Sequence, residues 1–91
     1  MLILTRDSVL DLLGEVTVAP ITRTVRDLRS EVPVGVEDGM PHDGAINLDH
    51  VATIDRGKIG ALITTLPPAK MEQVRSALVF ALGFERPTRV Q

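Results

Sequence analysis

Apolar and polar residues alternate along much of the first 65 positions, and this pattern predicts strands rather than helices there. The predicted strands share β-branched residues and flanking turn signals, and they cover residues 2–4, 15–24, 31–36, 45–51 and 59–65. The intervening segments are too short for helical crossovers, so hairpin-type connections are expected, the polar segment 23–30 among them.

The apolar period changes after position 67. Residues 68–82 carry apolar side chains at helical spacing, Pro68 suits the first turn of a helix, and Gly83 suits its end. A second, shorter helix or turn is expected from Thr5 or Asp7 to Leu13. The fold class predicted is mainly β with a C-terminal helix (α+β): a small, SH3-like, partly open barrel of about five strands capped by that helix.

Within the longest predicted strand, Pro20 lacks a backbone donor and predicts a bulge or an interruption of pairing. Val32, Val34 and Val36 are expected on one face of the next strand. Further along, Ile46 and Leu48 are expected to face the core.

The length of 91 residues fits one domain, predicted over residues 1–84 with a polar tail at 85–91. The core must be aliphatic, because Phe80 and Phe84 are the only aromatic residues. Few aromatic rings also leave little means of stacking nucleic-acid bases, so RNA contact would depend on hydrogen bonds and arginines.

The formal net charge is −2, which is not the overall positive charge typical of nucleic-acid-binding proteins. Arg23, Arg26 and Arg29 nevertheless recur at three-residue spacing in one polar segment. They form either a local basic patch or a solvated turn.

Several kinds of chemistry find no support in the sequence. There is no cysteine, no histidine spacing typical of a metal site and no glycine-rich phosphate loop, so neither a metal nor another cofactor is expected. The apolar start at residues 1–4 is too short for a signal peptide or a membrane span. A cytoplasmic protein without a membrane partner is predicted.

One set of polar residues on the β scaffold could bind a phosphodiester. Thr22, Arg23 and Thr24 end one predicted strand, and Asn47 and Asp49 should point to one face of another. The alternative is that the threonines reflect strand propensity and that Asn47 and Asp49 are turn or capping groups.

The order of these segments resembles the MazF/PemK toxins. Residues 2–7 look like the family strand that follows an Arg-Pro pair, and residues 16–22 resemble the strand that ends in its active-site threonine. Residues 47–55 resemble the next signature, and the strand at 59–66 with the helix after it matches the family's ending. The resemblance covers residues 1–84.

This resemblance implies a barrel of the CcdB and MazF type and a toxin of a type II toxin–antitoxin system. The activity implied is metal-independent, sequence-specific cleavage of single-stranded RNA that leaves a 2′,3′-cyclic phosphate and a 5′-hydroxyl. The implied partners are RNA, a cognate antitoxin and a second copy of the chain in a homodimer.

The resemblance also assigns roles to individual residues. Thr22 would bind a nonbridging phosphate oxygen, and Asp49 matches a general base of some members, although the arginine acid two positions earlier is Asn47 here. The adjacent His50 is expected to point to the opposite face of the strand. The residues expected to contact RNA are Arg23, Thr24, Arg26, Arg29 and Asn47.

The family's Arg-Pro pair would fall just before Met1, so the first strand and this arginine are expected upstream of the sequence. Two alternatives follow from that departure. One is a CcdB-like toxin that binds gyrase on the same fold and needs no catalytic threonine. The other is an inactive fragment whose missing strand leaves a barrel edge unpaired.

Overall fold

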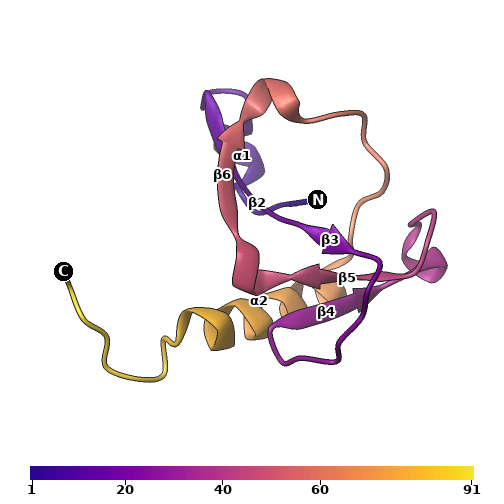
Figure 1. Ribbon diagram of the computed structural model, residues 1–91. Coiled ribbons are helices and arrows are strands. Elements are labelled where there is room, and N and C mark those ends of the chain that lie inside the picture. The colour runs from indigo at the N-terminus through magenta and orange to yellow at the C-terminus, as the bar shows by residue number, and fades with distance from the viewer.

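The computed structural model describes residues 1–91 and contains six short strands, two α-helices and three 3₁₀ helices (Figure 1). The strands are β1 (Leu2–Ile3), β2 (Glu15–Ala19), β3 (Ile21–Thr22), β4 (Glu31–Val34), β5 (Gly44–Asn47) and β6 (Ala52–Asp55). The α-helices are α1 (Asp7–Leu10) and α2 (Pro68–Leu82). The 3₁₀ helices are η1 (Val36–Asp38), η2 (Leu48–His50) and η3 (Arg56–Lys58).

The strands form two antiparallel sheets of three strands each, in the orders β1-β2-β6 and β3-β5-β4. The chain passes from one sheet to the other at Pro20, between β2 and β3, and again through η2, between β5 and β6. The interruption predicted at Pro20 is confirmed. Figure 1 shows β2 and β6 side by side, with β4 and β5 running in another direction below them.

The predicted class, a mainly β fold with a C-terminal helix, is confirmed, but the two sheets do not close into a barrel. One predicted connection is wrong. Strand β5 lies between β3 and β4, so segment 23–30 is not a hairpin and must cross over β5. Because β3 and β4 are each antiparallel to β5, they run parallel to one another, which a tight turn cannot achieve.

Helix α2 covers the side of the second sheet that carries the core. It begins at Pro68 and ends at Leu82, and the following Gly83 has a φ of 68°, the left-handed cap conformation that glycine adopts most readily. The helix prediction is confirmed. The core is aliphatic as expected, and its main cluster joins Ala19, Val32, Val34, Ile46, Leu48, Val74 and Ala77.

Three strand predictions need correction. Residues 59–65 form no strand, because β-branched residues need a neighbouring strand to pair with and this segment has none. The strand predicted over 45–51 ends at Asn47, where η2 begins. Val36 is exposed in η1 rather than aligned with Val32 and Val34, since the strand stops before Gly35.

The predicted short helix is present as α1, and a backbone bond from Leu13 N to Val9 O continues its turn. Residues 85–91 are exposed and contain no helix or strand, and the domain limit at residue 84 remains a prediction. No helix here combines the length and the apolar character that a membrane crossing requires.

Candidate functional site

The β3-β5-β4 sheet has an outer face, defined here as the face opposite Ile46. Thr22 pairs with Ala45, and Glu31 pairs with Asn47. Side chains of directly paired residues share a face, as do residues two apart on a strand, so all four lie on the outer face. Ala45 and Asn47 are nevertheless buried. The crossover loop, residues 23–30, contacts this part of the fold through Arg26, which bonds to Glu31, and through Ser30, which bonds to Asp49 and Leu48.

Thr22 ends β3 at the edge of the outer face and is half-buried. Its Oγ1 accepts a 3.1 Å hydrogen bond from the backbone N–H of Thr24. Close approach of β5 at this point depends on Gly44, because a Cβ there would collide with the Thr22 carbonyl oxygen. Thr24 and the neighbouring Arg23 are exposed at the start of the crossover loop.

Asn47 ends β5 and caps η2. Its Oδ1 accepts a 2.9 Å hydrogen bond from Asp49 N, and its Nδ2 lies 3.4 Å from His50 Nδ1. Since Oδ1 faces an N–H donor, the amide directs its NH₂ toward His50, whose Nδ1 then serves as the acceptor. The capping role raised for Asn47 from the sequence is therefore present in the structure.

Asp49 is exposed on η2, where its Oδ2 accepts a 2.6 Å hydrogen bond from the hydroxyl of the buried Ser30. The sequence predicted that Asp49 and Asn47 share one face of a strand. This prediction is wrong, because β5 ends at Asn47 and Asp49 lies on η2. The structure does not bring Asp49 and Thr22 together. Thr22 lies beside Ala45, and the rise from Ala45 to Asp49 is roughly 10 Å.

Arg26 and Glu31 tie the crossover loop to β4. The backbone N–H of Arg26 donates to Glu31 Oε1 at 3.0 Å, and Arg26 Nε lies 3.4 Å from Glu31 Oε2. The second distance makes an ion pair without hydrogen-bond geometry, so Oε2 is buried with no hydrogen bond. Asp27, the next residue of the loop, adopts a left-handed φ of 55°.

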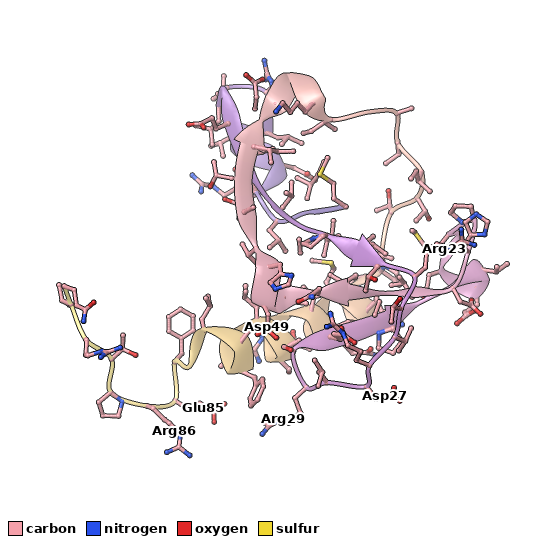
Figure 2. The ribbon with its side chains drawn as sticks, in the orientation of Figure 1. Arg23, Asp27, Arg29, Asp49, Glu85 and Arg86 are labelled. Carbon is pink, nitrogen blue, oxygen red and sulfur yellow. The ribbon has the colours of Figure 1, made fainter.

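Arg29 lies at the other end of the crossover loop, with its guanidinium carbon 4.2 Å from the centroid of the Phe80 ring on α2. This is a cation–π distance. Figure 2 shows Arg23 and Arg29 at opposite ends of the loop, with Asp27 between them. The three arginines are therefore spread along the loop rather than gathered into one patch.

Sequence reasoning assigned no role to Ser30, Glu31 or Phe80, and it placed His50 on the opposite strand face from Asp49. Glu31 alone offered a signal, as a charged residue directly before an apolar strand. Its burial depends on the crossover loop above it, which the sequence did not predict. The contact of Ser30 with Asp49 depends on the path of that loop, and the contact of His50 with Asn47 depends on η2. The contact of Phe80 with Arg29 depends on where α2 packs.

The perturbed ionisable groups lie elsewhere. On the exposed side of α2, a hydrogen bond from Arg75 lowers the pKa of Glu72, and the same bond raises the pKa of Arg75. No three His, Cys, Asp or Glu side chains converge in a way that could hold a metal ion.

Comparison with known proteins gives a consistent result. The family described as PemK-like, MazF-like toxin of type II toxin–antitoxin system matches residues 1–82. Two Mycobacterium tuberculosis proteins are similar in sequence. The probable endoribonuclease MazF2 is 38% identical over 84 residues, 91% of this chain and 82% of that protein. The endoribonuclease MazF3 is 43% identical over 81 residues, 85% of this chain and 79% of that protein.

Solved structures agree with the sequence relatives. The Mycobacterium tuberculosis toxin MazF-mt6 is 38% identical, with a TM-score of 0.85 over 90% of this chain and 83% of that one. A mycobacterial endoribonuclease in complex with its cognate antitoxin is 26% identical, with a TM-score of 0.81 over 93% of this chain and 81% of that one. A MazE-MazF structure from Deinococcus radiodurans, 22% identical with a TM-score of 0.75 over 89% of this chain and 81% of that one, shares the fold.

Proposed function

The chain belongs to the family of PemK-like, MazF-like toxins of type II toxin–antitoxin systems, and on that premise we propose that it is a cytoplasmic, sequence-specific endoribonuclease. Its substrate is single-stranded RNA, and its chemistry requires no metal or other cofactor. The observation that carries the proposal is the Thr22 hydroxyl at the end of β3, on the outer face and beside the arginine-bearing crossover loop.

In this reaction the 2′-hydroxyl attacks the adjacent phosphorus, the bond to the 5′-oxygen breaks, and a cyclic phosphate forms. Catalysis needs a base for the 2′-hydroxyl, donors for the charged phosphate and an acid for the leaving oxygen. The Thr22 oxygen already accepts a hydrogen bond from Thr24 N, so its own proton is available for a nonbridging phosphate oxygen.

Asp49 is the proposed general base. A base must lie within about 3 Å of the proton that it takes. Asp49 and Thr22 lie near opposite ends of β5, so the reacting nucleotide would lie between their side chains, with its 2′-hydroxyl toward Asp49 and its phosphate toward Thr22. Ser30 would fix the direction of the Asp49 carboxylate through its hydrogen bond.

The proposed RNA contacts follow the crossover loop. Arg23 and Thr24 are exposed at its start and Arg29 at its end, so RNA phosphates could bind along its length. Arg26 lies between them, half exposed. Asn47 is buried, so its proposed contact is limited to the amide N–H that does not face His50.

The partners proposed are a cognate antitoxin and a second copy of this chain. Residues 59–66 border an apolar cavity of about 580 Å³ that also includes residues of β1, α1 and α2. Leu62 and Ile63 on this segment are 84% and 63% exposed. Exposed apolar surface of this kind favours a protein interface, and we assign it to the homodimer. The relatives named above are endoribonucleases, which disfavours the gyrase-binding alternative.

Cleavage of single-stranded RNA in excess EDTA tests the proposal. The wild-type protein should produce fragments with cyclic phosphate ends, Thr22→Ser should retain activity, and Thr22→Ala should lose at least about 100-fold, as loss of one oxyanion donor does elsewhere. Gyrase supercoiling is measured beside it and should be unaffected. Full cleavage by Thr22→Ala would remove Thr22 from the mechanism, and gyrase inhibition without cleavage would overturn the proposed activity.

A further inference from the structure

Glu31 is a charged side chain in a position where charge is costly. Its side chain is 1% exposed on the outer face, beneath the crossover loop, and Oε2 has no hydrogen bond. A buried carboxylate oxygen without a donor destabilises a fold unless a nearby charge compensates it. The compensating charge here is Arg26.

Arg26 approaches Glu31 through two of its groups, the backbone N–H and the side-chain Nε. Nε is the inner nitrogen of the guanidinium, so the contacts with Glu31 leave the two terminal nitrogens unused. The Arg26 side chain is 53% exposed. An arginine held in this manner presents a two-pronged donor to solvent, which is the geometry that binds a phosphate through two parallel hydrogen bonds.

We propose that Glu31 is a positioning residue, which holds Arg26 so that the terminal guanidinium nitrogens of Arg26 donate hydrogen bonds to a phosphate of the bound RNA. This inference rests on the proposed ribonuclease function and adds to it the group that orients the RNA-binding loop. Of the three arginines in the crossover loop, Arg26 alone pairs with a carboxylate, while Arg29 stacks on Phe80.

Because both the main chain and the side chain of Arg26 are already held, less conformational entropy is lost when RNA binds to this residue. The left-handed turn at Asp27 directly follows Arg26. The loop is fixed again at Ser30 by the hydrogen bond to Asp49. Arg26 therefore lies in a loop segment that is attached close to the outer face, and Glu31 supplies the attachment at Arg26 itself.

The proposal predicts that neutralising Glu31 weakens RNA binding, whereas simple electrostatics predicts that it strengthens binding. Glu31→Gln removes a negative charge near the RNA, which by itself would strengthen binding. If Glu31 positions Arg26, the same variant binds RNA about 5- to 10-fold more weakly. In the Arg26→Ala background, Glu31→Gln should cause no further weakening, because no guanidinium remains to be positioned and the glutamine oxygen can still accept from the backbone N–H of residue 26.

The experiment measures binding of a fluorescent, 2′-O-methylated single-stranded RNA of mixed sequence, which cannot be cleaved, across a range of salt concentrations. Arg26→Ala should weaken binding about 10-fold and reduce the slope of log K against log salt by about 0.7, the value for one phosphate contact on a single strand. Arg26→Lys, which keeps the charge but not the fork, should weaken binding at low salt with the slope retained.

Glu72→Gln is the matched control, since Glu72 also pairs with an arginine, but on the exposed side of α2. Its Kd should stay within twofold of the wild type. Thermal unfolding of every variant separates a folding defect from a binding defect. Should Glu31→Gln not fold, Glu31→Asp provides the same test, because its shorter side chain cannot reach both Arg26 groups.

Equal or tighter RNA binding by Glu31→Gln in the wild-type background, or a further loss in the Arg26→Ala background, would overturn the positioning role. Failure of the proposed function looks different. A wild-type protein that binds RNA without cleaving it loses the assigned activity, while the Glu31 comparison stands. A wild-type protein that does not bind RNA overturns both.

Discussion

The Ser30 hydroxyl donates a 2.6 Å hydrogen bond to the Asp49 carboxylate, joining the end of the crossover loop to η2. A second bond, from Leu48 N to Ser30 O, strengthens the same junction. Asp49 could therefore matter for two reasons, as the general base or as an anchor for the loop. The two roles make different demands on the side chain, since an anchor needs only an acceptor atom whereas a base needs the carboxylate.

Asp49→Asn separates these roles, because asparagine retains an oxygen that can accept from Ser30 but cannot take a proton. We expect its free energy of unfolding to stay within about 0.5 kcal/mol of the wild type while its kcat falls at least about 100-fold, the scale of general-base catalysis. Ser30→Ala should show the reverse, a loss of about 1 kcal/mol in stability and a smaller loss of kcat. Chemical denaturation and RNA cleavage measure both quantities, and unchanged kcat in Asp49→Asn would leave Asp49 as an anchor only.

Much of the fold was predictable because its signals are local. The α2 boundaries follow from apolar spacing, Pro68 and Gly83, and the break between the sheets follows from the missing donor of Pro20. Neither depends on a distant part of the chain. The segment 59–65 shows where such signals end, because its β-branched composition favours a strand but pairing needs a neighbour that composition does not reveal.

The candidate site was only partly predictable, because its geometry depends on strand order. Thr22 lies at a strand end as its local sequence predicted. The burial of Glu31 beneath the crossover loop follows from β5 lying between β3 and β4, and the separation of Thr22 from Asp49 follows from the register that pairs Thr22 with Ala45. The sequence of the crossover loop is equally compatible with a hairpin, so alternation alone could not show that Glu31 would be covered.

The segment 59–66 should be the dimer contact if the apolar cavity is closed by a second copy. Ile63→Asp places a charge in that contact, and we expect it to convert a dimer to a monomer in light scattering at micromolar concentration, because an unpaired charge at a buried apolar interface is costly. Val90→Asp is the control, since Val90 is fully exposed in the tail and should leave the dimer intact. A dimer that persists in Ile63→Asp, or a wild-type monomer, would contradict this assignment.

Gly44 lies directly against Thr22 at the end of β3. Its substitution should therefore displace Thr22 without changing any side chain that is proposed to be catalytic. The Cβ of Gly44→Ala would overlap the Thr22 carbonyl oxygen, and a backbone atom cannot move aside as a flexible side chain can. We expect a loss of about 1–3 kcal/mol in stability and a loss of cleavage as β3 is displaced from β5. Gly14→Ala is the matched control, because a Cβ there meets no atom within 4 Å. Comparison of kcat under conditions where both variants remain folded checks the prediction, since a Gly44→Ala protein with wild-type kcat would show that the position of Thr22 tolerates a shift of β3.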